Sequence, residues 1–205
     1  MHIDHLVYGV PDLEEGVADL AARLGVRAVA GGRHEGRGTH NALLGLGDGT
    51  YLEIIAPDPT QGGPSGPRPF GLDASRRARL VAWALTAPDI DELVGRARAA
   101  GYDPGPVEDM SRLRQDKSRL RWRLTRGGAG GELVVPFLID WGTSEHPSVT
   151  APAGVVLKEL SIEHPAAGAI RRALSALEAS VAVREGPAAA LVARLRTPQG
   201  TVELR

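Results

Sequence analysis

The sequence predicts an α+β protein in which repeated βαβββ units form curved, cup-shaped mixed sheets covered by helices. Apolar runs at residues 3–10 and 80–87 are each followed by Pro-Asp and by the pattern of an amphipathic helix. These two segments begin 77 residues apart (80 − 3), and each is followed by further apolar runs separated by glycine turns. A Pro- and Gly-rich stretch from Asp58 to Gly71 lies between them and is typical of a linker.

Each predicted helix begins at an aspartate. Asp12 and Asp89 both follow a proline, and a glutamate lies three residues after each, which is the spacing of a capping box. Apolar residues then recur at helical spacing until Gly25 in the first copy and until Gly101 in the second. A hairpin is predicted at Gly47-Asp48-Gly49.

The last quarter of the chain repeats the same plan in a shorter form. A strand at Val155–Glu163 precedes a helix at Pro165–Leu177 and three short apolar runs. A glycine turn is also expected at 127–131 in the second unit. The predicted organisation is a first unit, a linker, a second unit and a compressed third unit packed on the same domain: residues 1–57, 58–78, 79–142 and 155–205.

Composition excludes several classes of function. The 205 residues include 24 basic and 25 acidic side chains, and this balance argues against a nucleic-acid-binding protein. Cysteine is absent, which excludes disulfides and thiolate metal sites. We expect a cytoplasmic protein without a membrane span, because neither a signal-peptide pattern nor an apolar run of about 18 residues is visible. The glycines lack dinucleotide or P-loop spacing, so no nucleotide cofactor is expected.

Four short motifs, taken together in their order and register, carry a family resemblance. They are Ile3-Asp4-His5, Gly31-Gly32-Arg33-His34, Gly38-Thr39-His40-Asn41 and Tyr51-Leu52-Glu53. With these motifs the chain resembles the glyoxalase-like domain family of the vicinal-oxygen-chelate superfamily, which also includes glyoxalase I, extradiol dioxygenases and bleomycin-resistance proteins. The resemblance covers roughly residues 2–141.

The resemblance implies a cup that holds a divalent metal. His5 and Glu53 fall on the two ligand positions of the first unit, where they would hold a metal or move a proton. His34 or His40 would then be the third ligand. An imidazole and carboxylate set suits Zn, Ni, Mn or Fe with open positions for an oxygen-rich substrate. The resemblance also leaves open whether the cup closes within one chain or across a homodimer.

The second unit departs from this pattern. The residue equivalent to His5 is Ala82, and the residue equivalent to Glu53 is Phe137. Two functions therefore stay open. One is an enzyme of the lyase, isomerase or dioxygenase type that acts on a small carbonyl or carboxylate compound. The other is a metal-free protein of the same fold that binds or sequesters a small molecule.

Strand alternation selects the side chains that face the cup. If the aliphatic set on each strand meets the helices, Glu53 and Asn41 line the cup, whereas His40 faces the helices. Asn41 would then bind a carbonyl or carboxylate group of the substrate. The alternative for His5 and Glu53 is a structural polar pair. His34 is expected in a glycine-rich loop, where an exposed side chain would be the more common outcome; the alternative is a residue that binds the substrate or the metal.

Arginines gather between Arg112 and Arg126, and the same alternation argument applies to them. Leu120, Trp122 and Leu124 form one face of the predicted strand, and Arg119, Arg121 and Arg123 form the other. If the arginine face points into the cup, Arg121 and Arg123 would bind a carboxylate, phosphate or enolate oxygen of the substrate. The alternative is a solvated face at the edge of the sheet.

Overall fold

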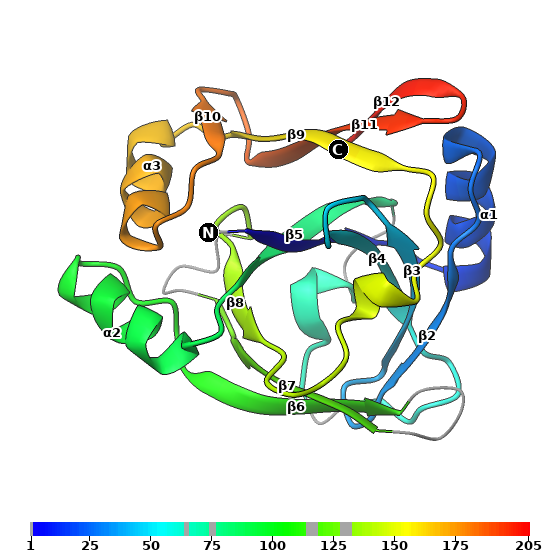
Figure 1. Cartoon of the computed structure of the whole chain (residues 1–205), viewed down its shortest axis with the longest axis horizontal. Coiled ribbons are helices and arrows are strands. Elements are labelled where there is room, and N and C mark those ends of the chain that lie inside the picture. The colour runs from blue at the N-terminus through cyan, green and yellow to red at the C-terminus, as the bar shows by residue number, and fades with distance from the viewer. Residues whose placement is uncertain (1, 64–65, 74–76, 114–118, 128–132) are drawn as a thin grey trace.

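The computed structural model describes residues 2–63, 66–73, 77–113, 119–127 and 133–205. The glycine turn predicted at 127–131 therefore lies almost wholly outside the described residues. In these ranges a strand, a helix and three further strands follow one another three times along the chain (Figure 1). They are β1 (Ile3–Gly9), α1 (Leu13–Leu24), β2 (Val29–His34), β3 (Thr39–Gly45), β4 (Tyr51–Pro57), η1 (Pro69–Gly71), β5 (Arg79–Thr86), α2 (Ile90–Ala99), β6 (Val107–Leu113), β7 (Arg119–Thr125), β8 (Phe137–Asp140), η2 (Pro147–Val149), β9 (Val156–Glu163), α3 (Ala167–Ala176), β10 (Ala182–Arg184), β11 (Ala190–Thr197) and β12 (Gly200–Leu204).

The first eight strands close into a barrel within one chain, in the order β1-β4-β3-β2-β6-β7-β8-β5. In each half the first strand pairs in parallel with the last, so that β1 lies beside β4 and β5 lies beside β8. The halves meet at a long antiparallel pairing of β1 with β5 and at a short pairing of β2 with β6. The predicted α+β class with curved mixed sheets is confirmed.

The last four strands form a second sheet in the order β10-β9-β11-β12. Its elements follow one another as in the first two units, but β9 pairs in parallel with β10, the strand directly after the helix. In the barrel units the strand after the helix lies at the far end of its half, away from the first strand. Figure 1 shows this sheet along one side of the barrel, with α3 beside α2.

The two barrel helices begin in different ways. Asp12 accepts a hydrogen bond from the backbone N–H of Glu15 at 2.9 Å, and Gly25 ends α1 with a φ of 73°. The side chain of Asp89 makes no capping hydrogen bond to α2, so the prediction of a second capping box is wrong. None of the helices in the described ranges is long and apolar enough to cross a membrane.

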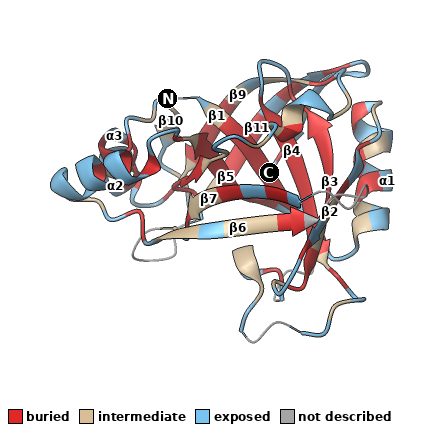
Figure 2. Cartoon of the chain, turned by 60° about the horizontal axis from the view of Figure 1, so that its bottom comes forward, coloured by how far each residue is buried: buried red, intermediate tan, exposed pale blue. Residues whose placement is uncertain are grey.

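Apolar side chains form two separate cores. The outer core lies between the barrel, the helices and the second sheet, and it includes Leu6, Ile54 and Trp83. The inner core lies inside the barrel and includes Val7, Ile55 and others from β5, β7 and β8. Figure 2 shows buried residues along the strands and exposed ones on the outward faces of the helices. Where the pairing is regular, as on β4, consecutive strand residues alternate between the two cores, so every second side chain faces the interior.

Candidate active site

The interior of the barrel contains a cavity of about 410 Å³. The first half contributes most of its polar wall, and the second half contributes mostly apolar and aromatic side chains. The polar wall includes His5, His34, Thr39, Asn41 and Glu53, and the facing wall includes Ala82, Trp122, Leu124, Val135, Phe137 and Ile139. A cavity of this size, apolar with a few convergent polar groups, is typical of a small-molecule site.

Glu53 lies at the centre of the polar wall. It is on β4, and the side chains next to it in sequence, Leu52 and Ile54, pack in the outer core, as the alternation predicted. Asn41 on the neighbouring strand β3 donates a hydrogen bond from Nδ2 to Glu53 Oε1. Both residues are buried, with exposed fractions of 4% for Asn41 and 8% for Glu53. The amide therefore fixes one carboxylate oxygen and leaves the other facing His5.

Arg112 fixes the orientation of that amide. It lies on β6 in the second half, is buried, and donates from Nη1 to Asn41 Oδ1 at 2.8 Å. Since a guanidinium only donates, the Asn41 oxygen must face Arg112 and its nitrogen must face Glu53. The three side chains thus form one chain of hydrogen bonds across the two halves of the barrel.

His34 belongs to the same cluster. Its Nδ1 lies 3.0 Å from Thr39 Oγ1, and its Nε2 lies 3.6 Å from Glu53 Oε1. Burial lowers the pKa of His34, the nearby Glu53 carboxylate opposes this, and the positive charge of Arg112 lowers it further. His34 is therefore a neutral imidazole at physiological pH. It lies on strand β2 and is buried, so the expectation of an exposed residue in a glycine-rich loop is wrong.

His5 is held by the carboxylate next to it in the chain. The pairing of β1 with β5 shifts between Ile3 and His5, which makes Asp4 the extra residue of a β-bulge. The bulge brings Asp4 Oδ1 to 2.7 Å from His5 Nδ1, although neighbouring strand residues normally point to opposite faces. The ring of His5 also stacks on Tyr51 with centroids 4.6 Å apart.

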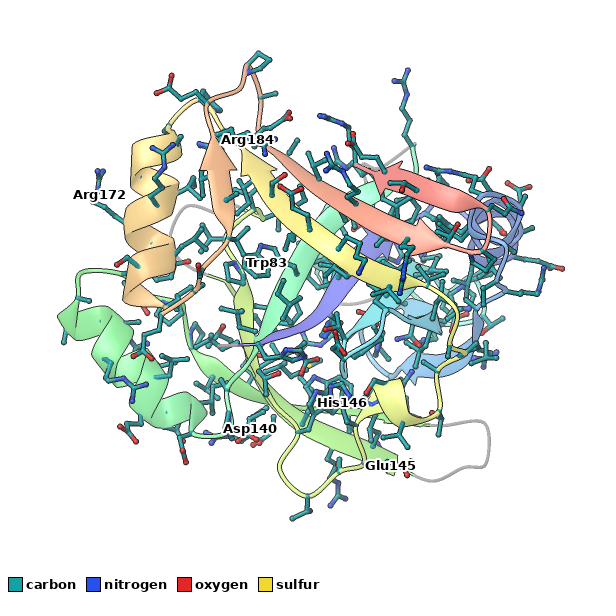
Figure 3. The ribbon with its side chains drawn as sticks, turned by 45° about the horizontal axis from the view of Figure 1, so that its top comes forward. Trp83, Asp140, Glu145, His146, Arg172 and Arg184 are labelled. Atoms are coloured by element: carbon teal, nitrogen blue, oxygen red, sulfur yellow. The ribbon has the colours of Figure 1, made fainter. Side chains whose placement is uncertain are left out.

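Asp4 is fully buried and has four side-chain partners. Its other contacts are His146 Nε2 at 3.2 Å, Trp141 Nε1 at 3.1 Å and Thr86 Oγ1 at 3.1 Å. Burial alone would raise the pKa of Asp4, but the hydrogen bonds and charges of His146 and His5 hold it well below its ordinary value. Figure 3 labels His146, which lies next to η2 and is partly exposed.

This network determines what His5 presents to the cavity. Because Asp4 is a carboxylate, it accepts a hydrogen bond from His5 Nδ1 and leaves Nε2 directed at the cavity. His5 Nε2 lies 3.9 Å from Glu53 Oε2, which is too long for a direct hydrogen bond. Two proton-accepting atoms therefore face each other across a gap beside the cavity.

Comparison with known families decides what this barrel is. The family model described as the glyoxalase-like domain matches residues 3–178. The chain belongs to the glyoxalase-like domain family. This family is part of the vicinal-oxygen-chelate superfamily, so the membership predicted from the four sequence motifs is confirmed. No curated protein sequence matches the chain.

Solved structures also resemble this chain. A hypothetical protein from Staphylococcus aureus is 13% identical. The match covers 92% of this chain and 87% of that protein, with a TM-score of 0.70. A methylmalonyl-CoA epimerase from Mycobacterium tuberculosis is 21% identical, covers 67% of this chain with 86% of its own, and has a TM-score of 0.47. A Streptomyces coelicolor methylmalonyl-CoA epimerase in complex with 2-nitronate-propionyl-CoA is 19% identical. The match covers 70% of this chain and 99% of the epimerase, with a TM-score of 0.47. The first of these likenesses shows that the fold is shared along nearly the whole chain.

The donor set of this family member does not fit a complete divalent-metal site. His5, His34 and Glu53 lie on one wall, but no group of three or more His, Asp or Glu in the described ranges is arranged to hold a metal ion. The opposite wall carries Ala82 and Phe137 at the two equivalent positions, and neither has a donor atom. Asn41 already occupies one oxygen of the Glu53 carboxylate.

The remaining predicted residues lie outside the cavity of this glyoxalase-like domain. Arg121 is exposed, and Arg123 forms an ion pair with Asp91 at 2.7 Å. The prediction that the arginine face of β7 points inward is therefore wrong, because Trp122 and Leu124 line the cavity instead. His40 alternates with Asn41 and is absent from the lining, as its position on the strand predicted.

Two site residues escaped the sequence interpretation. Arg112 belongs to the basic stretch of the sequence, which gives no sign of its role. It lies two residues after Met110 on β6, so both side chains share the face that lines the cavity. Asp4 belongs to the Ile3-Asp4-His5 motif, but strict alternation would direct the side chains of Asp4 and His5 to opposite faces of the strand. The β-bulge brings the two side chains together, and no sequence pattern predicts it.

Proposed function

We propose that this protein is a proton-transferring enzyme of the isomerase type that acts on a small carbonyl or carboxylate compound. The observation that carries the proposal is the pair of facing acceptor atoms, Glu53 Oε2 and His5 Nε2, beside a cavity of about 410 Å³. A general base must lie within reach of the proton that it abstracts, and both atoms border the same space.

The chain's own residues have distinct roles in this reaction. Glu53 takes a proton from the carbon next to the substrate carbonyl, and Asn41 keeps its second oxygen directed into the cavity. His5 exchanges a proton with the substrate from a neighbouring position on the same wall, and Asp4 keeps its ring in the required tautomer. The apolar wall around Trp122 and Phe137 excludes water from the reacting atoms.

The proposal is tested by hydrogen exchange at carbon. Wild-type protein is incubated in D₂O with a panel of 2-oxo, 2-hydroxy and 2-methyl carboxylic acids and their esters, and loss of the C–H signal is followed by ¹H NMR. We expect Glu53→Gln to lower the exchange rate by about 10²- to 10⁴-fold, because Gln keeps the shape but is not a base. Glu14→Gln on the exposed face of α1 is the matched control and should leave the rate unchanged.

A second function stands beside the first. The apolar half of the cavity supports a protein that binds and sequesters a small molecule without transforming it. If wild-type protein exchanges no member of the panel yet retains a small molecule through purification, as native mass spectrometry would detect, sequestration replaces catalysis. Equal exchange rates for wild type and Glu53→Gln would remove Glu53 from the proposed role.

A further inference from the structure

Aromatic side chains gather around the cavity although they are scarce in the chain. The sequence contains three tryptophans, three tyrosines and two phenylalanines, which are only 4% of its residues. Five of these eight line the cavity: Tyr51, Phe70, Trp122, Phe137 and Trp141. The larger outer core is built mostly from Leu, Val, Ile and Ala. Because aliphatic side chains also exclude water, the concentration of rings at the cavity indicates what the cavity binds.

One row of rings leads away from the proposed proton-transferring pair. The ring of Phe137 meets the ring of His5 edge to face, with centroids 5.4 Å apart. Phe137 also contacts Phe70, with centroids 6.0 Å apart and ring planes inclined by 31°. Separations of this size are typical of aromatic pairs. A ligand that places its carbonyl group beside His5 therefore has these rings next to the group that the carbonyl carries.

A second pair of rings lines the same cavity. Trp122 on β7 meets His34 edge to face at 6.2 Å, and its ring lies 5.3 Å from the ring of Trp141. The indole N–H of Trp141 donates to Asp4 at 3.1 Å, which holds this ring in place. Both imidazoles that line the cavity, His5 and His34, therefore border an aromatic surface as well as the Glu53 carboxylate.

Phe70 comes from the stretch that joins the two halves, and its backbone is strained. Its φ is 58° and its ψ is 19°, which is the left-handed region that a bulky side chain rarely adopts. The side chain is partly buried against the inner core and lines the cavity. Strained conformations of this kind cluster at ligand-binding sites, where the surrounding structure maintains them. The joining stretch thus does more than connect the halves, because it adds a ring to the cavity.

The volume of the cavity indicates the size of the ligand. Cavities of about 300–1,000 Å³ hold drug-sized molecules. At about 410 Å³, this cavity has room for more than an acid of three or four carbons. Water left beside such a small ligand would lie against an apolar wall, which is unfavourable, and a ring on the ligand would displace it.

We propose that the substrate is an aryl-substituted carbonyl or carboxylate compound. Its polar group lies beside Glu53 and His5, and its aromatic ring packs against Phe137, Phe70 and Trp122. This inference rests on the proposed function and names its substrate class. An acid without a ring leaves the aromatic wall in contact with water. An aliphatic group of similar size fills the space but lacks the edge-to-face and offset contacts that rings make with one another.

Three acids that share one reacting group test the proposal: 2-oxobutanoate, 4-cyclohexyl-2-oxobutanoate and 4-phenyl-2-oxobutanoate. Each is titrated into wild type by isothermal titration calorimetry. The phenyl acid should bind at least about tenfold more tightly than 2-oxobutanoate, because its ring is buried. It should also bind about threefold or more tightly than the cyclohexyl acid, because of the ring contacts. The proposal is overturned if the cyclohexyl acid binds as tightly as the phenyl acid, or if the phenyl acid does not bind.

Variants that exchange a ring for an aliphatic side chain localise the preference. Phe70→Leu and Phe137→Leu should each reduce the preference for the phenyl acid over the cyclohexyl acid by about two- to threefold. Tyr102→Leu is the matched control, because this ring packs against the outer core and is absent from the cavity lining, so the preference should stay as in wild type. An unchanged preference in both phenylalanine variants would overturn the proposal. If neither variant folds, as melting temperatures would reveal, the three acids with wild type still decide.

The failure of this proposal is distinguishable from the failure of the proposed function. Glu53→Gln should lose hydrogen exchange at carbon 3 of the phenyl acid and keep the preference among the three acids, because the base is removed and the rings remain. Wild type that prefers the phenyl acid but exchanges none of its hydrogens would contradict the proposed function alone. Wild type that exchanges all three acids and binds them equally would contradict the substrate class alone.

Discussion

The two halves of the barrel share one plan and differ in chemistry. Each half pairs its first strand in parallel with its last, and each presents the equivalent positions to the same cavity. The first half places His5 and Glu53 there, and the second places Ala82 and Phe137. The difference teaches that the duplicated fold provides two sets of positions but that only one of them carries acid–base groups. Among its described residues, the second half contributes the buried Arg112 and a largely apolar wall.

The halves also differ in what holds their side chains. In the first half, hydrogen bonds order the site, with Asp4 alone contacting four other side chains. In the second half, ring packing does so. Trp122 and Trp141 lie 5.3 Å apart, and Phe137 contacts the rings of Phe70 at 6.0 Å and His5 at 5.4 Å. Charge introduced into the apolar half should therefore be far more costly than a conservative change there.

The largest expected effect is that of Phe137→Glu, which gives the second half the residue type of the first. A carboxylate would then be buried opposite Glu53 without a compensating donor, and the free energy of unfolding should fall by about 3 kcal/mol. Added Zn²⁺ should restore part of this loss, because His5, Glu53 and the new carboxylate would together bind it. Urea unfolding at neutral pH, with and without Zn²⁺, measures both effects.

Phe137→Leu is the control for volume and should cost only about 1 kcal/mol, with no response to Zn²⁺. The comparison of the two halves would be contradicted if Zn²⁺ stabilised wild type as much as Phe137→Glu. The first half alone would then hold the metal, and the apolar residues of the second half would not prevent metal binding.

Much of this fold could be predicted from the sequence because its signals are local and occur twice. The strand, proline–aspartate and helix segments at residues 3 and 80 repeat, and Gly47 and Gly49 mark a hairpin with positive φ angles of 78° and 77°. Long-range pairing is not a local signal. The strand order of the second sheet therefore differs from that of the barrel units, although its elements occur in the same order along the chain.

The site could be predicted where a helix covers the outside of a strand. On β4 the aliphatic residues meet the helix side, so Glu53 faces inward as expected. The same assumption fails on β7, because Figure 1 shows β6 and β7 without a helix over their outer faces in the described structure. There the arginines face solvent and the apolar residues Trp122 and Leu124 turn inward. The tertiary arrangement determines which strands a helix covers, and the alternation of side chains along one strand does not reveal it.

A smaller effect is expected from Asp4→Asn, which weakens the hydrogen-bond order of the first half. The amide keeps one acceptor oxygen and turns an N–H group toward donors such as Trp141, so the free energy of unfolding should fall by about 2 kcal/mol at neutral pH. Because the pKa of Asp4 lies below its ordinary value of 3.8 in the folded protein, its contribution is complete above that value and is lost as the pH falls through the folded pKa. The difference between wild type and Asp4→Asn should therefore shrink as the pH falls below about 4.

Chemical unfolding at a series of pH values measures this difference. Asp19→Asn, on the exposed surface of α1, is the matched control and should leave the curve unchanged. A constant difference between wild type and Asp4→Asn from neutral to acidic pH would show that Asp4 contributes by packing rather than by its charge.

The smallest change to stability is expected from Gly31→Ala, at the seam where the halves meet. The added methyl group meets the far end of the Arg112 side chain and the Asn41 amide, both of which can shift, so the free energy of unfolding should fall by about 1 kcal/mol. Its effect on carbon–hydrogen exchange should be much larger than this, because the shift displaces the Asn41 amide that holds the Glu53 carboxylate. Gly95→Ala in α2, where a methyl group meets nothing within 4 Å, should stabilise the protein slightly and exchange like wild type. If Gly31→Ala and Gly95→Ala exchange at the same rate, the close approach of Gly31 to the Asn41 amide has no functional consequence.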